Sequence, residues 1–262
     1  MKTKLIIIVL FVLAFATGIY AQTAKPKQAV KKTTAQTTVK RASATKTVMP
    51  DVVISSYEEY DEFDGEEYDV YYIADKKTGE KIKELYSYER VYNFSEGLAL
   101  AQRYSDYKWG FIDKTGKEVI PFNYNDARNF TEGLAAVEIN FKWGFIDKAG
   151  KIIIPLQYVQ TWSFSEGLAQ VRLNNKIGFI NKTGVIVIPL KYEYDSDYYY
   201  SNGFSEGLAR VKLNNKFGFI DKKGKEIIPI IYDTAGNFTN GEAVVTLNGR
   251  KFFIDKTGKE IK

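Results

Sequence analysis

The side chains with which this sequence could do chemistry are carboxylates that recur at a fixed place in a repeated motif. Four glutamates occupy the third position of Phe-(Ser/Thr)-Glu-Gly-Leu-Ala: Glu96, Glu132, Glu166 and Glu206. The 262 residues contain no His and no Cys, which excludes imidazole bases, catalytic triads, thiolate nucleophiles and Cys or His metal ligands. A carboxylate-only hydrolase needs one pair of acids with distinct roles, and no pair is set apart here. We therefore expect these glutamates to accept backbone N–H bonds near the turn glycine, and we expect no enzyme, cofactor or metal.

A tandem repeat positions these carboxylates. The phenylalanine that opens the motif recurs five times, the last time in a degenerate copy: Phe94, Phe130, Phe164, Phe204 and Phe238. A second motif, Gly-Phe-Ile-(Asp/Asn)-Lys, begins at Gly110, Gly144, Gly178 and Gly218, with spacings of 34, 34 and 40 residues. Ile-Pro follows in each of these units, and a tyrosine comes three residues after the proline. The repeat indicates that one supersecondary unit is used five times.

Each unit has the pattern of three short antiparallel strands. The segment 209–213 alternates apolar and polar residues, and Asn214-Asn215 then supplies residues that tolerate the positive φ of a tight hairpin. Asp221-Lys-Lys-Gly224 suits a type I turn closed by a left-handed glycine, and the third strand is expected to stop at proline. We predict an all-β chain of units of about 34 residues, stacked as an open array. A closed five-bladed propeller is the alternative.

The combined motifs carry a family resemblance. Over about residues 92–262 the chain resembles the bacterial WG-repeat family, with the dipeptide intact at Trp109-Gly110 and Trp143-Gly144. A degenerate half-unit at 72–79 extends the similarity upstream. The resemblance implies a β-structured repeat that often occurs in exported bacterial proteins. It implies no catalytic or binding residues, and the recurring Phe, Gly and Glu positions are expected to be structural.

The residues before the repeat indicate an exported protein. Residues 1–21 have the pattern of a signal peptide, with a basic start, an apolar run of twelve residues and a plausible cleavage position at Ala21-Gln22. Residues 22–50 carry seven Lys/Arg and no acid, which predicts a disordered basic tether that could touch an anionic surface. Residues 51–69 carry nine acids and no base, which predicts an acidic linker before a repeat domain at 70–262. The segregated charge argues against a nucleic-acid groove.

Departures from the repeat are the candidate binding residues. The six extra residues of the longest spacing fall within 193–202, and insertions in repeat proteins map to loops, often on the binding face. We single out six residues there and nearby as a candidate surface: Tyr198, Tyr199, Tyr200, Asp195, Asp197 and Trp162. A tolerated surface insertion is the alternative. The atypical fifth unit is expected to cap the stack.

We therefore expect an exported, non-enzymatic binding module of the cell envelope or the exterior. Its partner would be a protein or a glycan held by the β-repeat surface. A structural spacer or assembly component is the second hypothesis, and a carboxylate-only hydrolase is the third. No transmembrane segment is expected after residue 21, because no later apolar run is long enough.

Overall fold

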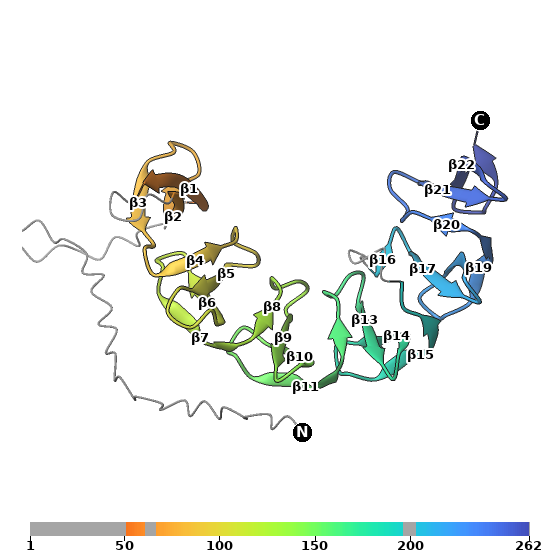
Figure 1. The fold of residues 1–262 in the computed structure, drawn as a ribbon, viewed down its shortest axis with the longest axis horizontal. Coiled ribbons are helices and arrows are strands. Elements are labelled where there is room, and N and C mark those ends of the chain that lie inside the picture. The colour runs from red at the N-terminus through yellow and green to blue at the C-terminus, as the bar shows by residue number, and fades with distance from the viewer. Residues whose placement is uncertain (1–50, 61–66, 196–202, 262) are drawn as a thin grey trace, which may run out of the picture. The chain divides into compact units, whose positions relative to one another are not determined.

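The regular structure of the described residues consists of β-strands. A computed structural model of the chain describes residues 51–60, 67–195 and 203–261. Within these ranges no helix is long and apolar enough to cross a membrane. The strands form a three-stranded sheet and five four-stranded sheets, which follow one another in chain order (Figure 1). Each sheet pairs strands that are consecutive in the chain, and none closes into a barrel. The predicted all-β repeat is confirmed.

The sheets are named here by their place in the chain. The N-terminal sheet contains β1 (Val52–Tyr60), β2 (Glu67–Asp75) and β3 (Lys81–Glu84). Unit 1 contains β4 (Tyr88–Val91), β5 (Leu98–Arg103), β6 (Trp109–Asp113) and β7 (Glu118–Tyr124). Unit 2 contains β8 (Asp126–Ala127), β9 (Ala135–Ile139), β10 (Lys142–Ile146) and β11 (Ile152–Tyr158).

The remaining units repeat this order. Unit 3 contains β12 (Gln160–Thr161), β13 (Leu168–Leu173), β14 (Lys176–Asn181) and β15 (Ile186–Glu193). Unit 4 contains β16 (Phe204–Ser205), β17 (Leu208–Leu213), β18 (Lys216–Ile220) and β19 (Glu226–Tyr232). Unit 5 contains β20 (Thr234–Ala235), β21 (Glu242–Leu247), β22 (Arg250–Asp255) and β23 (Glu260–Ile261). The two-residue first strands of units 2 to 5 were not predicted, because two residues carry no alternation that a pattern could reveal.

Turn chemistry fixes the hairpins of each unit. In unit 3, Asn174 and Asn175 join β13 to β14 with φ angles of 49° and 62°. Asn is among the few residues that adopt this left-handed conformation readily. The next turn ends at Gly184, whose φ is 82° and whose N–H donates to the carbonyl of Asn181 at 2.9 Å. Both turns are of the kind that the sequence predicted.

The third long strand does not stop at proline, which corrects the sequence-based expectation. In unit 4, β19 pairs with β18 at Ile228, shifts register, and pairs again at Tyr232. Pro229 lies inside this bulge, where no ladder hydrogen bond is required of it. A Cβ on Gly218, which faces the bulge, would lie 2.7 Å from the carbonyl oxygen of Ile228. The glycine of the Trp-Gly dipeptide is therefore needed because the bulged strand passes so close.

The segment 51–69 is not a linker throughout, which is a second correction. Val52–Tyr60 forms β1, and Glu67–Asp75 forms β2. The β-branched residues at the start of β1 decide this, since Val52 and Ile54 are buried against unit 1 in one cluster with Ala99 and Phe122. β2 continues into the Asp-Lys-Lys-Thr-Gly turn of the half-unit seen in the sequence. Among the described acids, Glu58 and Glu59 lie near the end of β1, and Glu67 and Asp69 lie near the start of β2.

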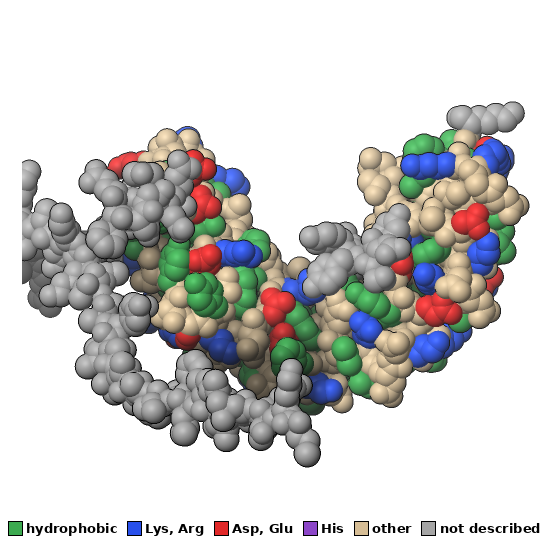
Figure 2. All heavy atoms as spheres, in the orientation of Figure 1, with side chains coloured by type: hydrophobic (Ala, Val, Ile, Leu, Met, Phe, Trp, Pro, Cys, Tyr) green, Lys and Arg blue, Asp and Glu red, His purple; other side chains and the backbone are tan. Residues whose placement is uncertain are grey.

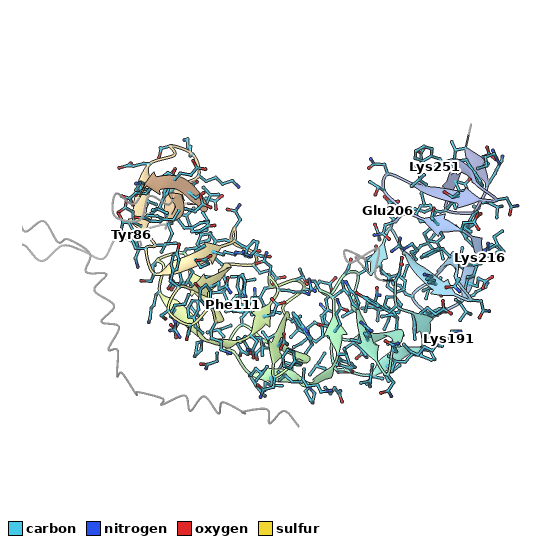
Figure 3. The ribbon with its side chains drawn as sticks, in the orientation of Figure 1. Tyr86, Phe111, Lys191, Glu206, Lys216 and Lys251 are labelled. Atoms are coloured by element: carbon cyan, nitrogen blue, oxygen red, sulfur yellow. The ribbon has the colours of Figure 1, made fainter. Side chains whose placement is uncertain are left out.

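The hydrophobic core lies between successive units. Phe179 of unit 3 and Phe204 of unit 4 meet edge to face, with ring centroids 5.1 Å apart, and both are fully buried. The same pair forms at each other junction of the five units: Phe111 with Phe130, Phe145 with Phe164, and Phe219 with Phe238. Phe111 is labelled in Figure 3. Because each sheet is too small to bury its own face, stability comes from stacking neighbours.

Candidate functional site

Each glutamate of the repeated motif reaches into the next unit. The carboxylate oxygens of Glu166 accept the N–H of Gly207 at 3.0 and 3.1 Å, and one of them lies 3.0 Å from the Lys222 ammonium. The equivalent links are Glu96 with Gly133 and Lys148, Glu132 with Gly167 and Lys182, and Glu206 with Gly241 and Lys256. Glu206 lies where unit 4 meets unit 5 (Figure 3). We call these four sets the glutamate links.

The backbone holds these glutamates in an unusual conformation. Glu166 has a φ of 54°, and the glycine that follows it has a φ of 88°. Non-glycine residues are uncommon in this left-handed region. The serine before each of three links adds a further bond, because its hydroxyl donates to the carbonyl of the next unit's phenylalanine, as Ser165 does to Phe204 at 2.8 Å. The motif thus joins one unit to the next by several polar contacts.

The protonation of these glutamates follows from the links. The Lys148 ammonium and the Gly133 amide hold the pKa of Glu96 below its usual range, and Lys256 and Gly241 do the same for Glu206. Burial alone would raise the pKa of Glu166, but the hydrogen bonds from Lys222 and Gly207 outweigh it and lower the value. A general acid at neutral pH needs the opposite shift. The arrangement stabilises charged carboxylates at junctions.

Two of the candidate residues, Trp162 and Asp195, line a small pocket between units 3 and 4. Trp162, Gln170 and Tyr194 line it from unit 3, and Arg210 and Lys212 line it from unit 4. Trp162 is only 4 % exposed, so this candidate binding residue forms a buried wall of the pocket. Its ring centroid lies 6.3 Å from that of Tyr194.

Charged groups face one another in this pocket. Asp195 lies 4.0 Å from the buried guanidinium of Arg210 and 3.7 Å from the Lys212 ammonium. Its Oδ2 atom is buried and accepts no hydrogen bond from the described residues. Arg210 also donates to the carbonyl of Ala235 at 2.6 Å, which fixes its position. On the unit 3 side, the Arg172 guanidinium lies 4.0 Å from the ring centroid of Tyr194.

Two of the six candidate residues lie within the described ranges. Tyr198, Tyr199, Tyr200 and Asp197 lie outside the described residues. The structure therefore places Asp195 and Trp162 in one pocket. Across the described ranges, acidic residues do not gather in threes in a way that could hold a metal ion. Figure 2 shows basic and acidic side chains interspersed over the visible face of the described residues.

Sequence reasoning missed two aromatic residues at hairpin tips. Phe141 is 87 % exposed with a φ of 61°, and Tyr107 is 61 % exposed with a φ of 55°. Units 3 and 4 carry Asn at the position of Phe141, and unit 5 carries Gly249. Aligning the hairpins of the repeats would have revealed these departures.

Comparisons with known proteins agree with the repeat but give no activity. The sequence profile of the WG containing repeat matches residues 109–143, 143–176, 177–217 and 217–250. No curated protein matches the chain significantly. Among solved structures, it is similar to Hsv2 of "Kluyvelomyces marxianus", with 8 % identity, 76 % of this chain and 70 % of that chain covered, and a TM-score of 0.47.

Two further structures are similar to a comparable degree. Streptogramin B lyase has 16 % identity, with 80 % of this chain and 86 % of that chain covered and a TM-score of 0.39. A Bacteroides caccae protein of unknown function has 15 % identity, with 80 % and 91 % covered and a TM-score of 0.31. Similarities of this size carry no inference about fold or activity. The family profile does, because its four matches span more than half of the chain: the chain belongs to the WG containing repeat family.

Proposed function

We propose that this chain is an exported, non-enzymatic binding module that holds a protein or glycan partner of the cell envelope. The observation that carries the proposal is the pocket between units 3 and 4, where Tyr194, Asp195, Arg210 and Lys212 converge. Export rests on the signal-like pattern of residues 1–21.

The pocket differs from the glutamate links because it contains a hydrogen-bond acceptor that is not yet used. The carboxylates of the glutamate links are occupied by the next unit's glycine and lysine, so they serve the stack. In the pocket, the buried Oδ2 of Asp195 has no hydrogen-bond donor among the described residues. A partner with hydroxyl or amide donors would supply one, and the ring of Tyr194 would provide apolar contact. Protein surfaces and glycans both have this chemistry.

A matched pair of lysine variants tests the proposal. Affinity capture from cell-envelope extract identifies the partner, and titration of the purified partner then gives the dissociation constant. We expect Lys212→Thr to weaken binding about tenfold, as loss of one charged contact in a pocket does. Lys223→Thr removes the same charge from an exposed turn of unit 4 and should leave binding unchanged.

Equal affinity of the Lys212 and Lys223 variants would contradict the pocket as the binding site. Undiminished binding after Tyr198, Tyr199 and Tyr200 are all changed to Ser would remove these candidate residues from the contact. A spacer would tolerate both sets of changes and would depend instead on residues 22–50.

A further inference from the structure

The hairpin tips of units 1 and 2 expose aromatic rings that the fold does not use. Phe141, between β9 and β10, is 87 % exposed, and Tyr107, between β5 and β6, is 61 % exposed. Each directly precedes a lysine that begins or adjoins the second strand, Lys142 in unit 2 and Lys108 in unit 1. The two rings occupy equivalent positions of units whose cores pack together, so they lie along the same edge of the repeat.

The conformation of Phe141 is unfavourable for the chain itself. Asn140 and Phe141 form a two-residue turn with φ angles of 50° and 61°, which asparagine and glycine adopt much more easily than a bulky aromatic residue. The Glu138 carboxylate accepts the N–H of Phe141 at 2.7 Å and holds the turn in place. An exposed ring kept in a strained turn is a local departure of the kind that marks functional positions.

The charges beside these tips favour an anionic partner. Lys142 and Lys176, at the tips of units 2 and 3, form no ion pair among the described residues, whereas Lys216 pairs with Asp233 at 2.5 Å and Arg250 with Glu260 at 2.6 Å. Near the tip of unit 1, the Arg103 guanidinium offsets the charge of Asp106 at 2.6 Å, whereas near the tip of unit 2 Glu138 has no ion-pair partner among the described residues. Asp106 binds Arg103 and the N–H of Lys108, and Glu138 binds the N–H of Phe141.

We propose that the tips of units 1 and 2 form a contact surface for an anionic lipid bilayer. The rings of Phe141 and Tyr107 enter the interfacial region, and the neighbouring lysines contact lipid phosphates. A bilayer fits better than an acidic protein, because the two rings stand singly on projecting turns of successive units, each beside a base. A bilayer receives separate rings without needing a matching pocket for each one. This surface is independent of the pocket between units 3 and 4.

Sedimentation of the full chain with vesicles tests this inference. Vesicles of phosphatidylcholine with one part in four phosphatidylglycerol supply the anionic surface, and pure phosphatidylcholine is the neutral control. We expect F141N to weaken binding to anionic vesicles about tenfold or more, because a buried phenyl ring is lost. Phe253→Asn, which removes a ring that is 53 % exposed on unit 5, should leave binding unchanged. F141N should also unfold at the same or higher urea concentration than the original chain, so lost binding cannot reflect lost folding.

A fluorescence measurement locates the contact even where other segments also bind lipid. Phe141→Trp should show a blue-shifted emission in anionic vesicles. Asn215→Trp, at the same turn position of unit 4 with a φ of 58°, should show no shift.

Any of four results would overturn the inference. In the sedimentation experiment, these are undiminished vesicle binding by F141N and equal binding of the original chain to neutral and anionic vesicles. In the fluorescence experiment, it is an equal emission shift for tryptophan at positions 141 and 215. The fourth is that F141N weakens the capture of an acidic protein but not the binding of vesicles.

Discussion

One position of the repeat lies in two different environments, one at the junction between units 3 and 4 and the other on the far face of unit 5. Phe179 is fully buried because Phe204 of the next unit covers it, whereas the equivalent Phe253 of unit 5 is 53 % exposed. Neighbouring positions on unit 5 have also changed, since Glu242 and Lys251 stand where unit 4 has Leu208 and Phe217. The comparison teaches that a repeat residue acquires its role from the unit that packs against it, since Phe253, with no described unit on its face, stays half-exposed beside polar side chains.

The dipeptide glycine shows the same contrast. Gly144 faces the proline-containing bulge of β11, so closely that a Cβ would lie 2.5 Å from the carbonyl oxygen of Ile154. Unit 5 lacks the Ile-Pro segment within the described residues, and Phe252 occupies the equivalent position. The glycine is therefore required only where the bulged strand follows.

The largest change in the free energy of unfolding should come from removing the buried ring of Phe179. Phe179→Ala removes a fully buried aromatic side chain and should lower the free energy of unfolding by about 3–5 kcal/mol. Phe253→Ala should change it by less than about 0.5 kcal/mol, as for most exposed positions. Urea denaturation of both variants measures the difference. Similar losses would mean that the two positions are not distinguished by the next unit.

A smaller change in the free energy of unfolding is expected from a substitution in the Trp143-Gly144 dipeptide. Gly144→Ala should lower the free energy of unfolding by about 1–3 kcal/mol, because the added methyl group overlaps backbone atoms that cannot move alone. Phe252→Ala should not introduce any such overlap, and it serves as the comparison in the same denaturation experiment. A neutral Gly144→Ala would show that the bulge adapts easily.

The smallest effect concerns the glutamate links and depends on pH. Because the pKa of Glu96 is lowered in the folded chain, its charged form adds stability above the usual glutamate range, and this contribution is lost as the pH falls through the lowered value. Glu96→Gln should reduce stability at neutral pH by about 0.2–1 kcal/mol and should flatten the dependence of unfolding on acid. Denaturation at a series of pH values measures both.

The terminal unit again provides the control. Asn240 stands where the other units have glutamate. Asn240→Glu adds a carboxylate that faces no link lysine among the described residues, so the acid dependence should not increase. A steeper dependence would mean that the lysines of the links are not the cause.

Much of the fold could be predicted because the repeated motifs have local physical causes. Asn174 and Asn175 predict their hairpin, and Gly184 predicts its turn, from the conformations that these residues tolerate. The family could also be identified from Trp109-Gly110 and its copies. The path of β19 through Pro229 could not be predicted, because the bulge depends on the absence of a side chain on Gly218 of the neighbouring strand.

The candidate site was less predictable. Trp162 was named as a candidate binding residue, but it is buried in a cluster formed by residues of both unit 3 and unit 4. The strand at 52–60 was predicted as a linker because the segment has a high density of acidic residues, although its first residues are β-branched. Phe141 escaped notice because its exposure follows from a turn geometry and not from a periodic pattern.

The glutamate links give the repeat a direction. Every unit that carries a link presents a carboxylate toward the C-terminus, and each unit that accepts one presents a glycine amide and a lysine toward the N-terminus. Adding or removing one whole unit therefore leaves matching partners on both sides of the change. Such an array can lengthen or shorten by gene duplication or deletion without any compensating substitution, provided that the first and last sheets are kept.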